Sequence, residues 1–154
     1  SLSIRDEKEA MEILEDASSA GIGLTCLPST NLWLQDFSEN RTPRFRGIAP
    51  IIEAKNLGIP VMIASDNCQD SFYPYGNHDL LSVFKLALIS GHLDENNWFD
   101  SITHLPSEWM GFNNKIQEGS EASFLKFNQS SISEIMTLSK NHFQIWEKGK
   151  LIRE

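Results

Sequence analysis

Residues 22–27 (IGLTCL) and residues 60–65 (PVMIAS) decide the fold, because each is a short and largely apolar stretch. The first does not alternate apolar with polar residues, which is typical of a strand covered on both faces. Residues 48–57 (IAPIIEAKNL) lie between the two and predict a helix that ends at Gly58. A strand, a helix and a second strand in this order predict a parallel βαβ unit, and hence an α/β fold.

Further helices are predicted on either side of this unit. Residues 4–20 repeat apolar side chains at three- and four-residue spacing, as an amphipathic helix does. Residues 77–89 (NHDLLSVFKLALI) predict a more apolar helix directly after the second loop. Residues 95–112 predict two short helices that are separated at Pro106.

The pattern of the sequence changes near Gly119. Residues 122–127 (ASFLKF) and residues 143–153 (FQIWEKGKLIR) alternate as strands do, and a Lys-Gly pair in the second stretch predicts a hairpin turn. We therefore predict two parts, an α/β segment at residues 1–118 and a strand-rich segment at residues 119–154.

Size and charge exclude several classes of protein. The chain has 154 residues and a formal net charge of −8, whereas a complete (β/α)8 barrel needs roughly 250 residues. The acidic balance gives no electrostatic reason to bind nucleic acid or anionic lipid, and no apolar run approaches the roughly 18 residues of a membrane span. Two cysteines do not form a disulfide framework, so we expect a cytoplasmic protein with reduced thiols and with neither nucleic-acid nor membrane partners.

Residues 66–76 (DNCQDSFYPYG) form a polar and aromatic loop after the second strand, where parallel α/β folds bind their ligands. Asp66 follows the strand directly, and its carboxylate is suited to bind a divalent cation or to act as a base. A capping role in the Asp-Asn turn is the alternative, and position alone slightly favours it. The aromatic residues either wall a pocket for a flat ring or pack the loop onto the sheet, and we expect some of each: Phe72, Tyr73 and Tyr75.

Residues 28–46 follow the first strand and show no helical or strand period, so they predict a long loop. This segment contains a basic group, Arg41, Arg44 and Arg46. Such a group suits either phosphate binding or salt bridges that hold the loop in place, and the acidity of the whole chain favours the salt bridges.

The thiols and imidazoles form no recognisable metal motif. Cys26 and Cys68 both fall near strand ends and predict buried free thiols. The four histidines have none of the short spacings that bind zinc, and each predicts a surface or core residue: His78, His92, His104 and His142.

Three stretches carry a resemblance to a known family: LPSTNLWLQ at residues 27–35, RTPRFRGI at residues 41–48, and IASDNCQDSFYPYGNHDLL at residues 63–81. The last contains the long pattern S-D-N-x-x-D-x-[FW]-x-P-x-G-x-x-D-[LM]-L. Together they resemble the C-terminal part of cytosine deaminase-type enzymes of the metal-dependent amidohydrolase superfamily. The resemblance implies a partial (β/α)8 TIM barrel, namely its last two strands and their helices, together with the C-terminal part of a small β-sandwich.

The same resemblance implies a hydrolytic deaminase of a cytosine-like nucleobase or related N-heterocycle, and the triazine-ring hydrolases are also similar. Asp66 occupies the position of an aspartate that binds a divalent metal, zinc or iron, and accepts a proton from the metal-bound water. Asn67 lies where the family contacts the substrate ring, and Phe72 lies where an aromatic side chain walls the pocket.

The sequence lacks the family's other metal ligands, which are an H-x-H pair and two later histidines, and it also lacks the catalytic glutamate. A catalytic zinc or iron needs about three protein ligands, so we expect the chain alone to be inactive and to bind no metal tightly. The alternative is a non-catalytic interaction module that has kept part of the hydrolase fold. In either case, the open edges of the two parallel strands predict a homo-oligomer.

Overall fold

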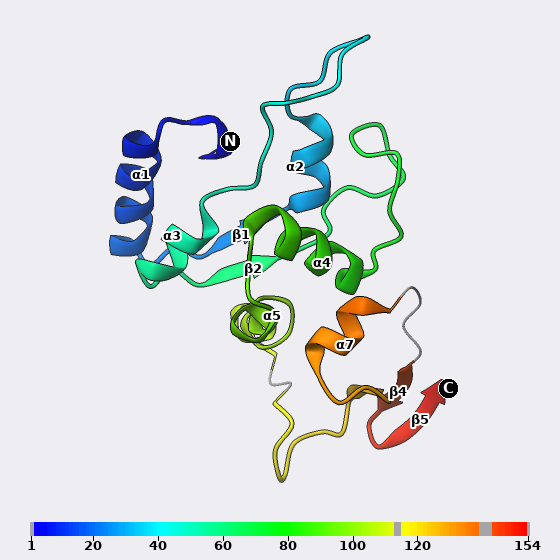
Figure 1. Ribbon diagram of the computed structural model, residues 1–154. Helices are drawn as coiled ribbons and strands as arrows, with labels where there is room; N and C mark the ends of the chain where they lie inside the picture. The colour runs from blue at the N-terminus through cyan, green and yellow to red at the C-terminus, as the bar shows by residue number, and fades with distance from the viewer. Residues whose placement is uncertain (1, 113–114, 139–142, 154) are drawn as a thin grey trace. The chain divides into compact units, whose positions relative to one another are not determined.

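A computed structural model describes the chain except residues 1, 113–114, 139–142 and 154 (Figure 1). The chain forms two compact units, Ser1–Asp94 and Glu95–Glu154. The second unit begins with the short helix α5 (Glu95–Trp98), which contacts α7 (Ile132–Thr137). Gly119 lies within this unit, and the assignment of residues 119–154 to a separate segment stays a prediction.

The predicted βαβ unit is confirmed. In the first unit, β1 (Leu24–Cys26) pairs in parallel with β2 (Val61–Ile63), so that Leu24 lies opposite Val61 and Cys26 opposite Ile63. The helix α3 (Ile51–Asn56) lies between the two strands in sequence and contacts β2. It buries Ile51 and Ala54 almost completely.

The amphipathic helix α1 (Glu7–Ser19) is also confirmed, and a short 3-10 turn (Leu2–Ile4) precedes it. Asp6 is its N-cap, because the Asp6 carboxylate accepts a hydrogen bond from the Glu9 backbone N–H at 2.9 Å. The helix buries Ala10 and Leu14 and contacts α3. Burying one leucine contributes about 2 kcal/mol, so this narrow face is enough to hold the helix in place.

The predicted loop at residues 28–46 is wrong in its first part, because residues Pro28–Leu34 form the helix α2. A helix of 7 residues is too short to display a period. Pro28 stands at its first position, where the missing N–H would have no partner and the fixed φ suits a helix. The first turn is buried beside the sheet, as the low exposure of Ser29 and Thr30 indicates. The remainder, residues 35–46, is irregular as predicted.

The helix α4 (Leu80–Gly91) starts three positions later than the sequence predicted. Asp79 determines this start, because its carboxylate caps the Leu81 N–H at 3.2 Å and accepts from the Ser82 hydroxyl at 2.5 Å. The helix contacts β2 and α2. Its inner face, formed by Val83, Phe84 and Ala87, completes the core around the two strands.

In the second unit, α5 is followed by a 3-10 turn (Phe99–Ile102) and by α6 (His104–Trp109). The predicted break at Pro106 is wrong. The helical path is interrupted at Thr103 (φ −125°, ψ −83°), and Pro106 is the third residue of α6. Proline is tolerated there because N–H groups in the first turn have no partner within the helix.

The predicted strands of the second unit are confirmed as an antiparallel sheet in the order β3 (Phe124–Phe127), β4 (Phe143–Glu147) and β5 (Lys150–Arg153). Lys148 (φ 50°) and Gly149 (φ 76°) form the predicted hairpin turn, and their positive φ values are those that a two-residue hairpin requires. The helix α7 was not predicted. The helix begins with the pattern S-x-x-E, in which the Ser131 hydroxyl oxygen accepts a hydrogen bond from the Glu134 backbone N–H at 3.2 Å.

No helix in the described part of the chain has both the length and the apolar composition that crossing a membrane requires.

Candidate functional site

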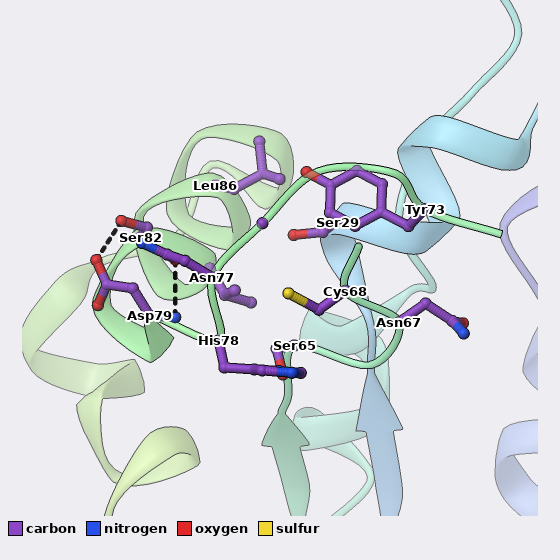
Figure 2. A pocket seen from close by; sticks show the side chains of 12 residues that line it. Ser29, Ser65, Asn67, Cys68, Tyr73, Asn77, His78, Asp79, Ser82 and Leu86 are labelled. Carbon is purple, nitrogen blue, oxygen red and sulfur yellow. Dashed lines mark hydrogen bonds between the residues drawn. The ribbon is translucent and has the colours of Figure 1, made fainter. Parts of the chain in front are cut away.

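A small cavity of about 150 Å³ lies where the two parallel strands end (Figure 2). Ser29 reaches it from the segment after β1, and Ser65 and Asn67 reach it from the segment after β2. The other lining side chains come from the following loop and from α4: Cys68, Tyr73, Asn77, His78, Asp79, Ser82, Val83 and Leu86. The cavity therefore occupies the edge of the sheet where parallel α/β folds bind ligands.

Asp66 lies between two residues that line the cavity, but its own side chain is exposed and does not line it. Its backbone is left-handed (φ 59°), a conformation that Asp adopts more readily than most residues. Among the described residues, its carboxylate accepts no hydrogen bond from the protein. The capping role that position alone favoured for Asp66 is therefore not observed, and the carboxylate is available to an external partner.

Asp70 caps this loop instead. One carboxylate oxygen, Oδ1, accepts hydrogen bonds from the backbone N–H groups of Phe72 and Tyr73, both at 2.9 Å. The other oxygen, Oδ2, accepts from the Asn67 side-chain amide at 2.5 Å. These hydrogen bonds, the one from Asn67 first among them, lower the pKa of Asp70 below its ordinary value, so the group is ionised at neutral pH.

The structure separates the two residues predicted to contact a substrate. Asn67 is half-buried and lines the cavity, although Figure 2 shows its amide directed away from the Cys68 thiol. Phe72 is 59% exposed and is not among the lining residues.

Tyr73 is the aromatic residue that lines the cavity. It packs edge-to-face against Trp33 (centroids 6.2 Å apart) and Tyr75 (6.1 Å), and Trp33 in turn meets Tyr75 at 5.3 Å. Such pairs contribute about 1 kcal/mol beyond their buried area. Tyr73 thus lines the cavity and also packs the loop against α2 rather than against the sheet, whereas a pocket for a flat ring stays a prediction.

Sequence reasoning missed the role of His78, whose Nδ1 lies 3.2 Å from the Ser65 hydroxyl at the edge of the cavity (Figure 2). Both residues fall inside the S-D-N pattern, which was the available signal. Of the other histidines, His104 lies 3.3 Å from the Glu108 carboxylate, and His92 is the C-cap of α4. His142 lies outside the described residues.

The two cysteines differ in environment. Cys26 is buried as predicted, and desolvation raises the pKa of its thiol to about 11, while hydrogen bonds with the backbone of Ala49 and Leu27 oppose the shift. Cys68 was also predicted to be buried, but it is only half-buried, because its sulfur faces the cavity (Figure 2).

The salt-bridge role of the basic group is confirmed at Arg41, which contacts the Asp36 carboxylate at 2.6 Å. Asp36 also accepts from the backbone N–H groups of Arg44 and Phe45. The pKa of Asp36 consequently lies well below its usual range, with the Arg41 hydrogen bond as the main cause. Arg46 donates to the Leu32 carbonyl at 3.0 Å. These contacts pin the segment after α2.

A catalytic metal ion does not fit the described residues by themselves. They contain no group of three or more His, Cys, Asp or Glu side chains that could hold a metal ion. A catalytic zinc site needs about three protein ligands, whereas Asp66 offers one unpartnered carboxylate.

Comparison with known proteins shows that the sequence is similar to a deaminase. The chain is 33% identical over 156 residues to the pterin deaminase of Rhizobium rhizogenes, a match that covers 99% of this chain and 36% of that protein. The resemblance to deaminases that the sequence predicted is thus confirmed. The chain spans little more than a third of the length of this relative. No family model matches the chain.

Two solved structures share the fold of this chain. The 5-methylcytosine deaminase of Klebsiella pneumoniae, liganded with 5-fluorocytosine, superposes with a TM-score of 0.84 and 22% identity over 98% of this chain and 38% of that one. The N-isopropylammelide isopropylaminohydrolase of Burkholderia multivorans gives a TM-score of 0.71 and 17% identity, covering 98% of this chain and 36% of that one. The chain therefore has the α/β fold of part of an amidohydrolase.

Proposed function

We propose that the chain is part of a metal-dependent hydrolytic deaminase that removes an amino group from an N-heterocycle. The observation that carries this proposal is the 33% identity to a pterin deaminase along 99% of the chain. In the reaction, water adds to the ring carbon that bears the amine, the C–N bond breaks, and ammonia leaves behind a ring carbonyl. The first substrate to test is pterin, and cytosine and a substituted triazine are the alternatives that the two structural neighbours suggest.

Within such an enzyme, β1 and β2 would be the last two strands of a (β/α)8 barrel. The parallel register of the pair and the TM-score of 0.84 support this assignment. Residues 119–154 would contribute strands to a small β-sandwich, which the antiparallel order β3-β4-β5 supports.

Asp66 would be one ligand of the divalent metal, zinc or iron, with the remaining ligands outside the described residues. This role is supported by the place of Asp66 after β2 and by its exposed carboxylate, which has no protein partner among the described residues. Asn67 would contact the substrate ring, and Phe72 would wall the ring's pocket. The half-buried position of Asn67 at the cavity supports the first of these two roles.

Ammonia release by the purified full-length gene product, which we propose supplies the metal ligands outside residues 1–154, tests the proposal. Pterin, cytosine and N-isopropylammelide are supplied separately, and ammonia is measured for the first two and isopropylamine for the third. We expect turnover of at least one ring. Absence of turnover with all three would contradict the proposed class of reaction.

A non-catalytic, self-associating module is the second candidate function. The observation that favours it is that, among the described residues, β1 and β2 pair only with each other, so each leaves one edge open. The same assay separates the two candidates, because a binding module releases no amine. A homo-oligomer formed through these edges stays a prediction, and so does the cytoplasmic location, which rests on the two free cysteines.

A further inference from the structure

Asp70 makes four hydrogen bonds within the loop after β2. Its carboxylate accepts from two backbone N–H groups and from the Asn67 side chain, and its own N–H donates to the Tyr73 carbonyl at 3.1 Å. The contact with Asn67 reaches the side chain that we place against the substrate ring. This contact is not needed to close the turn, because the backbone bonds already do so.

An ionised carboxylate accepts hydrogen bonds and donates none. The end of the Asn67 amide that faces Asp70 is therefore the NH2 end. This orientation does not depend on which substrate ring is bound. The carbonyl oxygen of Asn67 is the other end of this amide, and within the described part of the chain it accepts from no protein donor. Asp70 thus decides which end of the amide remains for a ligand.

We propose that Asp70 is a positioning residue, which turns the Asn67 amide so that its carbonyl oxygen is offered to an N–H donor of the substrate. This inference rests on the proposed function, because it assigns the hydrogen-bond character of the same site. It defines the substrate as a ring that presents an amino or N–H group towards Asn67, rather than a carbonyl or unprotonated ring nitrogen.

Substitution Asp70→Asn in the gene product tests this assignment. The new amide still offers an oxygen to the backbone N–H groups of the turn, but its NH2 group competes for the Asn67 carbonyl oxygen. For the ring that the wild type converts fastest, we expect KM to rise about 10-fold, the worth of one lost hydrogen bond. We expect kcat to change by less than about 2-fold, because the loop itself is retained.

The double variant Asn67→Asp/Asp70→Asn provides the rescue. It restores an amide–carboxylate bond with the two partners exchanged, and position 67 again offers an oxygen acceptor. We expect its KM to return to within about 2-fold of the wild type, a strong departure from additivity. Asp16→Asn, on an exposed part of α1, is the matched control and should leave KM unchanged.

A merely structural role for Asp70 predicts a different result, namely a parallel loss of kcat and stability that the exchange does not repair in KM. An unchanged KM in Asp70→Asn, or a failed rescue, would overturn the inference. If the wild type converts none of the rings, the proposed function fails. The side-chain amide signal of Asn67 in ¹⁵N NMR then still tests whether Asp70 orients this amide. One of its two protons should be shifted by the hydrogen bond in the wild type and should lose that shift in Asp70→Asn.

Discussion

Three aspartates lie between β2 and α4, and their surroundings give each a different use. Asp66 is exposed and unpartnered among the described residues, Asp70 closes the loop, and Asp79 caps α4. The place of Asp66 after an apolar strand could be predicted from the sequence. The capping role of Asp70 could not, because it depends on a loop conformation in which Asp66 and Gln69 are both left-handed.

The two thiols also differ in their surroundings, and this difference predicts a difference in their reactivity. Thiolate is the reactive form, and a pKa of about 11 leaves roughly one Cys26 side chain in a thousand ionised at pH 8. Cys68 is half-buried at the cavity. Brief treatment with iodoacetamide at pH 8 should therefore label Cys68 and spare Cys26.

Peptide mass spectrometry measures the labelled fraction at each cysteine. Labelling of Cys26 should increase as the pH approaches 11, because the raised pKa delays its ionisation until then. Denaturant should make the two thiols equally reactive and serves as the control. Equal labelling of both thiols in the native protein at pH 8 would contradict the buried environment of Cys26.

At the scale of elements, the parts with a local signal were predicted and those without one were not. The βαβ unit, α1 and the β4–β5 hairpin each carry a period, a cap or a turn pair that is visible in the sequence. By contrast, α2 has only 7 residues, and tertiary burial of its first turn rather than a period holds it. The start of α7 does carry a local signal, the S-x-x-E pattern, from which the helix could have been predicted.

The hairpin turn offers a prediction about stability. Lys148 has a φ of 50°, which Asn adopts more easily than Lys, and Asn-Gly is the preferred pair for such a turn. Lys148→Asn should raise the free energy of unfolding by about 0.5–1 kcal/mol, as measured by urea denaturation. Lys150→Asn, which places Asn within β5, is the matched control and should lower it. Equal effects of the two substitutions would contradict the assigned turn.

At the scale of the whole molecule, the comparisons cover nearly all of this chain but little more than a third of its relatives. The carboxylate after β2, the neighbouring amide and the aromatic loop were all predicted from one sequence pattern. The other side chains that line the cavity beside them were not predicted, because Ser29 and Leu86 reach it from elements distant in sequence. One exposed carboxylate beside a strand-end cavity is what we expect of a single segment of the proposed larger active site.

The metal content of the protein is the most direct test of the proposed role of Asp66. The gene product and its Asp66→Asn variant are purified in parallel with the Asp16→Asn control, and zinc and iron are quantified per chain. Asn adopts the left-handed backbone of position 66 without strain, so the fold should persist. For the full-length gene product, with the remaining metal ligands that we propose outside residues 1–154, we expect about one metal ion per molecule in the wild type and the control, and a small fraction of that in Asp66→Asn. Equal metal content in all three proteins would contradict the role of Asp66.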